Sequence, residues 1–252
     1  MQSLWTTGNP KTLKGQKKGY LSFVLHLAPH KLSGYNVCAS ATKGCISSCL
    51  NTAGRGGMFE KGVTVGNTGA SLVEKITNGS VMNTIQAARI RKTKQYFEDR
   101  ENFLTQLAKD TERAIKYAEK KNLIPVFRLN GTSDVKWENI IIGDDKNIFQ
   151  LFPSVIWYDY TKHNNRKDLP SNYSLTFSRA ESNGDKIPDA IANGMNVAVV
   201  FRTKELPDMY MGYPVVNGDE SDLRFLDAKG VIVGLKAKGK AKQDTTGFVV
   251  DV

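Results

Sequence analysis

Apolar and polar positions follow two different rhythms along this chain of 252 residues. In the first half, apolar side chains recur every three or four positions, which predicts two helices, over about 68–95 and about 99–121. The apolar stripe of the first comprises Leu72, Ile76, Met82, Ile85 and Ile90. That of the second comprises Phe103, Leu107, Ala114, Ile115 and Ala118, opposite Lys and Glu residues. Both stripes are typical of helices that pack against a core on one side.

Short apolar runs dominate the rest of the chain and predict strands. One precedes the helices, at 20–29, and six follow them, at 124–129, 154–160, 173–178, 196–201, 214–216 and 231–236. Several are apolar on consecutive residues, as in strands buried on both faces of a parallel sheet. Between strands, 137–143 and 187–194 favour helices, the second with Pro188 near its start and Gly194 at its end.

The alternation of strands and helices predicts an α/β fold with a mostly parallel sheet. We favour a TIM-like (β/α) barrel, complete or incomplete, over an open doubly wound sheet, because no glycine-rich dinucleotide turn follows any strand. We expect one domain over 1–252 that includes an irregular basic arm at 1–19 and a cysteine-rich metal-binding segment at 38–57.

Composition narrows the cellular setting and the partners. No apolar run approaches the ~20 residues that span a bilayer, and the polar N-terminus lacks the apolar region of a secretory signal. We therefore expect a cytoplasmic protein without a membrane partner. The net charge of +10 is compatible with nucleic acid or an anionic ligand as a partner, and equally with simple solubility.

All three cysteines, Cys38, Cys45 and Cys49, lie in the short stretch CASATKGCISSCLNTAGRGG. A helical turn over 45–50 would place Cys45 and Cys49 on one face, and Cys38 would join them from the preceding loop. The neighbouring residues are small, so backbone N–H groups and the hydroxyls of nearby Ser and Thr residues can approach sulfur. A nearby helix N-terminus and Lys43 would favour thiolate over thiol.

Three interpretations of the cysteines remain open. The favoured one is a [4Fe–4S] cluster held by three cysteines, with the fourth iron open or bound by another group. A zinc site would need a further ligand such as His26 or His30, and the C-x2-C pair typical of structural zinc is absent. The third interpretation is that the thiols are ordinary buried side chains. The spacing C-x6-C-x3-C matches neither the bacterial ferredoxin run nor most radical S-adenosylmethionine enzymes, so it gives S-adenosylmethionine no support.

Polar residues follow the predicted strands, and ligands bind at the carboxyl ends of strands in α/β folds. As acid–base groups we single out Asp134, Asp159, Lys162, Asp219 and Asp222. As ligand-binding groups we single out Asn130, Ser178, Arg202 and Arg224. Each of these residue types is also ordinary in turns and helix caps, so the set as a whole carries more weight than any member.

Several stretches together resemble the bacteriophage family called gene product eighty-eight. They are, in order, CLNTAGRG, RLNGTSDVKWE, YDYTK, LTFSRAES, NVAVVF, GDESDLRFLD and VIVGLKAKG, and the resemblance runs from about residue 20 to the C-terminus. The resemblance implies a virus-encoded protein and strengthens the expectation of a cluster, because the cysteines lie in its most recognisable part. It implies no catalytic residue.

Two classes of function follow. In the first, an iron–sulfur enzyme uses its open iron on a small molecule at the strand ends, by lyase, hydrolase or redox chemistry. In the second, a non-catalytic module binds nucleic acid or a host protein, and its cluster, or zinc, is structural or senses redox state.

Overall fold

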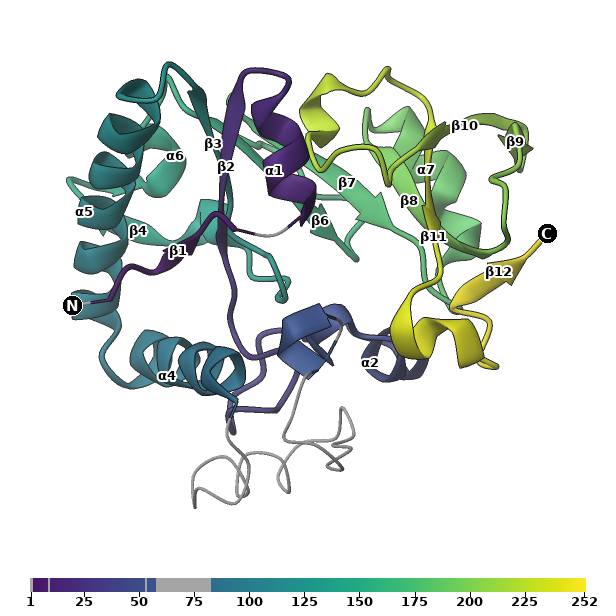
Figure 1. Cartoon of the computed structure of the whole chain (residues 1–252), viewed down its shortest axis with the longest axis horizontal. Helices are drawn as coiled ribbons and strands as arrows, with labels where there is room; N and C mark the ends of the chain where they lie inside the picture. Colours follow the sequence, from purple (N-terminus) through teal and green to yellow (C-terminus); the bar gives the residue numbers. More distant parts are fainter. Residues whose placement is uncertain (1, 9, 53, 58–82) are drawn as a thin grey trace.

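The structure, a computed structural model, describes residues 2–8, 10–52, 54–57 and 83–252. Ten strands form one large sheet, with path order β1-β2-β3-β6-β7-β8-β11-β10-β9 and β12 paired to β8 (Figure 1). Their bounds are β1 Trp5–Thr6, β2 Tyr20–Leu25, β3 Ile124–Arg128, β6 Ile156–Thr161, β7 Tyr173–Ser178, β8 Asn196–Arg202, β9 Met209–Tyr210, β10 Tyr213–Asn217, β11 Ile232–Lys236 and β12 Val249–Asp251. A separate hairpin pairs β4 (Ile141–Gly143) with β5 (Lys146–Asn147).

The sheet is mostly parallel, as the sequence predicts. From β2 to β10 every pairing along the path is parallel, and only the two-residue strands β1 and β9 pair antiparallel with their neighbours. Among the described residues β1 does not pair with β9, so the sheet is open and the favoured TIM-like barrel is not confirmed. Short terminal strands of opposite direction limit each end of the sheet instead.

Two strands share one edge of β8. β7 pairs with its first half, at Asn196 to Ala198, and β12 pairs with its second half, at Val200 to Arg202. The chain leaving β7 must therefore diverge at Arg179, whose Nη1 donates to the carbonyl of Phe248 at 3.0 Å.

Helices cover the sheet. Their bounds are α1 Pro10–Gln16, α2 Lys43–Ser47, α4 Thr84–Glu98, α5 Arg100–Glu119, α6 Ile148–Leu151 and α7 Ile187–Ala192. The predicted stripe of α5 lies in the main core, where Phe103, Leu107 and Ala118 are fully buried with Phe127 of β3 and Trp157 of β6. A smaller cluster around Val126 and Tyr158 covers the opposite face. Alternate residues of β3 and β6 thus supply two separate cores.

Most predicted elements are confirmed, with boundary shifts of a few residues. α7 begins with Pro188 in its first turn, and Gly194 follows it with a φ of +78°, as a C-terminal glycine should. The described part of the first predicted helix is α4. Residues 68–82 of the predicted helix, with Leu72, Ile76 and Met82, lie outside the described residues.

Two of the predicted elements were wrong. Residues 1–19 are not an irregular arm, because they form β1 and α1. Trp5 anchors β1, packing on Phe127 at 4.9 Å between ring centroids. Nor is 137–143 a helix: a single 3-10 turn at Trp137–Asn139 leads into β4.

Candidate metal centre at the carboxyl ends of the strands

The cysteine segment crosses the carboxyl ends of β3, β6 and β7. At β3, the main-chain N–H of Asp134 donates to the carbonyl of Val37 at 2.9 Å. At β6, Ser40 Oγ lies 3.2 Å from His163 Nε2, and at β7, Gly44 N donates to Glu181 Oε1 at 2.7 Å. In Figure 1 the segment lies below the strands, between α4 and β12. It therefore occupies the edge where α/β folds bind ligands.

α2 carries Cys45 and is fixed by its own cap and by Glu181. Thr42 caps the helix, since its Oγ1 accepts from Cys45 N at 3.2 Å while it donates to Glu181 Oε2 at 2.7 Å. Burial raises the pKa of Glu181, but the hydrogen bonds from Gly44 and Thr42 outweigh it and lower the pKa overall. Glu181 is thus a carboxylate held at the helix N-terminus, where negative charge is favourable.

The helical turn differs slightly from the sequence prediction. α2 ends at Ser47, so Cys49 lies just beyond it, with Cys49 N donating to Ile46 O at 3.4 Å. The hydroxyls near the cysteines also bond elsewhere than expected. Thr42 bonds Glu181, Ser40 bonds His163, and Ser47 donates to Gly44 O at 3.1 Å.

The three thiols are partly buried and influence one another electrostatically. Burial raises the pKa of Cys38 to about 12 and of Cys49 to about 11. Cys45 and Cys49 add to the shift of Cys38, and Cys45 adds to that of Cys49. Burial also raises the pKa of Cys45. The expectation that Lys43 and the helix would favour thiolates is therefore wrong for the chain without a metal. Backbone hydrogen bonds from His30 to Cys38 and from Asn51 to Cys49 oppose the rise.

Within the described part of the chain, no three His, Cys, Asp or Glu side chains lie close enough to hold a single metal ion. Zinc binds sulfur at about 2.3 Å, which would bring its ligands almost into mutual contact. Among the described residues no preformed site for a single zinc ion is therefore present.

Four buried polar atoms near the thiols have no hydrogen-bond partner among the described residues: His30 Nδ1, Ser48 Oγ, Arg89 Nε and Asp134 Oδ1. Others lie away from the thiols, such as Trp157 Nε1 and Arg224 Nη1. Ser48 adjoins Cys49, and Arg89 on α4 donates to Asn51 O at 2.9 Å. Unsatisfied buried polar atoms are costly, so the four near the thiols are available to a polar group bound there.

Lys162, which follows β6, lies in this site. Its Nζ donates to Ser178 Oγ at 2.8 Å, to Ser178 O at 3.0 Å and to Arg179 O at 3.1 Å. Burial lowers the pKa of Lys162, and the neighbouring Cys45, Asp134 and Glu181 act against that shift. Of the predicted rim residues, Asp134 and Lys162 thus lie beside the cysteines, and Ser178 is bonded to Lys162.

Asn130 and Asp159 lie deeper, beneath this edge. The carboxylate of Asp159 is fully buried and accepts from Asn130 N at 2.7 Å and Tyr173 OH at 3.0 Å. Asn130 Oδ1 in turn accepts from Val135 N at 2.9 Å and Trp137 Nε1 at 3.3 Å. These bonds hold the loop that follows β3, and so position Asp134.

The remaining predicted residues lie elsewhere. Asp222 pairs with Arg128 at 3.1 Å beside Tyr158, and Arg224 pairs with Asp227 at 3.3 Å. Asp219 bonds Lys238 at 2.7 Å, and Arg202 bonds Asp251 at 2.9 Å. The structure therefore does not bring the whole predicted set together at one point.

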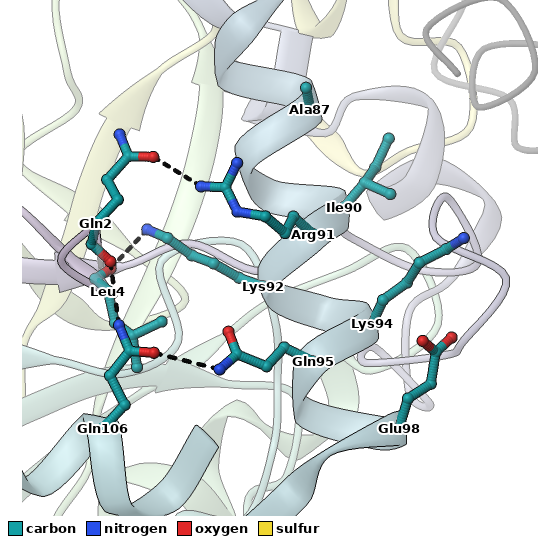
Figure 2. Close-up of a pocket in the computed structure, with 10 residues that line it drawn as sticks. All are labelled: Gln2, Leu4, Ala87, Ile90, Arg91, Lys92, Lys94, Gln95, Glu98 and Gln106. Carbon is teal, nitrogen blue, oxygen red and sulfur yellow. Dashed lines mark hydrogen bonds between the residues drawn. The ribbon is translucent and has the colours of Figure 1, made fainter. Parts of the chain in front are cut away.

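A cavity of about 630 Å³ lies apart from the cysteines, between the N-terminal residues and α4. Figure 2 shows Arg91 and Lys92 reaching from α4 toward Gln2 and the backbone of Leu4, which they bond at 2.7 and 2.6 Å. No cysteine lines it. The cavity is therefore distinct from the candidate metal centre. Arg91 and Lys92, which line it, already bond other parts of the chain.

Sequence reasoning missed Arg89 and the carbonyl of Thr132, which accepts from Cys38 Sγ at 3.6 Å. The basic run RIRKTK at 89–94 was the available signal for Arg89. The contact with Thr132 could not be predicted from the sequence, because every residue has a backbone carbonyl.

The family model described as Gene product 88 matches residues 3–252. The chain belongs to this family. No curated protein and no solved structure shows a significant match to this member of the Gene product 88 family. In the described part of the chain, no helix has the length and apolar character needed to span a membrane.

Proposed function

We propose that this protein is an iron–sulfur protein in which Cys38, Cys45 and Cys49 hold a [4Fe–4S] cluster at the carboxyl edge of the sheet. One observation carries the proposal. Every thiol of the chain lies in one partly buried segment across the ends of β3, β6 and β7, and there the thiols influence one another electrostatically.

The surroundings support a negatively charged group. Three thiolates concentrate negative charge, and Arg89 beside Cys49 and Lys162 beside Cys45 supply positive charge to offset it. Backbone N–H groups of His30 and Asn51 donate to two of the sulfurs. Donors to sulfur and neighbouring charge are what tune such clusters.

Three cysteines leave one iron for another donor. The group when bound supplies electron transfer, or Lewis acidity at that iron. A small molecule entering from the strand ends would meet Lys162 and His163, the first cationic and the second hydrogen-bonded to Ser40. Since cytoplasm keeps thiols reduced, the proposal also suits a cytoplasmic protein.

The test is metal analysis of protein purified without oxygen, beside a control in which all three cysteines are replaced by alanine. We expect a brown protein with about four iron and four sulfide per chain, and a colourless control. Colourless wild-type protein that carries zinc, or no metal at all, would overturn the proposal.

A further inference from the structure

We propose that Asp134 supplies the fourth protein ligand, through its Oδ1, to the iron that the cysteines leave unbound. This inference rests on the proposed cluster and deepens it. It would make the cluster fully protein-ligated, with a carboxylate at the position otherwise left to a small molecule.

Position is the first argument. Asp134 N donates to Val37 O at 2.9 Å, so the loop after β3 is paired with the residue that precedes Cys38. Two residues earlier in that loop, Thr132 O accepts from Cys38 Sγ at 3.6 Å. The carboxylate of Asp134 is also close enough to add to the electrostatic environment of both Cys38 and Cys45. It therefore lies on the side of the segment that faces two of the three thiols.

Only one of the two oxygens of this carboxylate has a hydrogen-bond partner among the described residues. Oδ2 accepts from the main-chain N–H of Lys162 at 2.8 Å, which orients the side chain. Oδ1 is buried and has no hydrogen-bond partner among the described residues. A buried carboxylate oxygen without a donor is costly, and a positively charged iron would satisfy it.

Other side chains near the thiols suit the role less well. Both carboxylate oxygens of Glu181 are already bonded, to Gly44 N and Thr42 Oγ1 at 2.7 Å each. His163 Nε2 is engaged by Ser40. His30 Nδ1 is buried without a partner, so His30 is the rival ligand, but its backbone is what bonds Cys38.

The experiment adds cyanide, a small anion that binds an open iron, to the dithionite-reduced cluster and records the electron paramagnetic resonance spectrum. Three proteins are compared: wild type, Asp134→Asn and His30→Gln. Asparagine keeps an acceptor for Lys162 N, so the loop should persist. We expect cyanide to change the spectrum of Asp134→Asn only. A cyanide effect on wild type, or on His30→Gln and not Asp134→Asn, would overturn the assignment.

A further variant tests the inference if Asp134→Asn loses the cluster. If Asp134→Asn fails to retain iron, Asp134→Cys decides, because a thiolate at that position should restore about four irons per chain and remain indifferent to cyanide. Failure of that variant to hold iron overturns the inference. Wild-type protein without iron and sulfide would instead overturn the proposed function, so the two failures are distinguishable.

Discussion

Asp134 and Lys162 belong to loops that follow different strands, yet Lys162 N donates to Asp134 Oδ2 at 2.8 Å. This bond joins the ends of β3 and β6 directly beneath the cysteine segment. Lys162 Nζ then reaches Ser178 at the end of β7. Asp134 and Lys162 thus connect the carboxyl ends of the adjacent strands β3, β6 and β7. The cysteine segment lies against these connected strand ends.

The first prediction concerns the cysteines. Cys38→Ala, Cys45→Ala and Cys49→Ala should each lower the iron content sharply, because a cluster with two remaining thiolates loses much of its binding free energy. Iron and sulfide per chain, after anaerobic purification, measure the effect. A variant that keeps full iron would show that its thiol is not a ligand.

The second prediction tests the close approach of α2 to the C-terminal loop. A Cβ at Gly44 would lie 2.5 Å from Phe248 Cβ and 2.7 Å from Glu181 Oε2. Alanine gains about 1 kcal/mol of helix propensity, but the overlap costs more, so we expect Gly44→Ala to lose about 1–2 kcal/mol of unfolding free energy. Iron content should fall with it, because α2 carries Cys45.

Gly143→Ala is the matched control for this substitution. Nothing lies within 4 Å of a Cβ built at Gly143, and its φ is not positive. Thermal unfolding of both variants, with wild type, measures the difference. Equal melting temperatures for the two variants would show that α2 has room to shift away from Phe248.

The sequence predicted the interior strands and α5 well, for a physical reason. Consecutive apolar residues such as those of β8 must be buried on both faces, and the stripe of α5 has one face to bury. β1 is different, since its two residues are held by tertiary contacts, among them the packing of Trp5 on Phe127. Tertiary contact of that kind leaves no local pattern.

The candidate site was predictable only in part. Strand ends identified Asp134 and Lys162, because carboxyl ends of parallel strands meet at one edge. Position after a predicted strand could not distinguish Asp134 and Lys162 from Asp222, which also follows a strand. The loop after β10 turns back and pairs Asp222 with Arg128 on β3. Such a return depends on the order of strands in the sheet, which the pattern of apolar runs does not encode.

The third prediction concerns the hydrogen bonds that Lys162 makes at the strand ends beside the cysteine segment. Lys162→Met removes the hydrogen bonds to Ser178 and Arg179 and leaves their carbonyls without that donor. We expect a loss of about 2 kcal/mol in unfolding free energy, less than the sum of the bonds, because the variant no longer buries an ammonium group. Urea unfolding of the metal-free protein measures it. Lys167→Met, at an exposed lysine of the following loop, should change little.

The fourth prediction is a pH dependence centred on Asp159. Burial raises its pKa to about 7, despite Arg128 and the hydrogen bonds from Asn130 and Tyr173. The folded protein therefore keeps a proton there that the unfolded chain, with a pKa of about 3.9, has already released. Between about pH 4 and pH 7 the folded state binds more protons, so stability must fall as the pH rises.

Asp159→Asn removes this titration, so the comparison with wild type isolates it. The unfolding free energy of wild type minus that of the variant should fall by up to about 1.4 kcal/mol per pH unit between pH 4 and 7, and level off above. Urea unfolding at pH 5, 6, 7 and 8 gives the curve, and Asp185→Asn, at an exposed side chain, should give a flat one. A difference that rises with pH would mean that the bonds from Arg128, Asn130 and Tyr173 outweigh burial and keep Asp159 ionised.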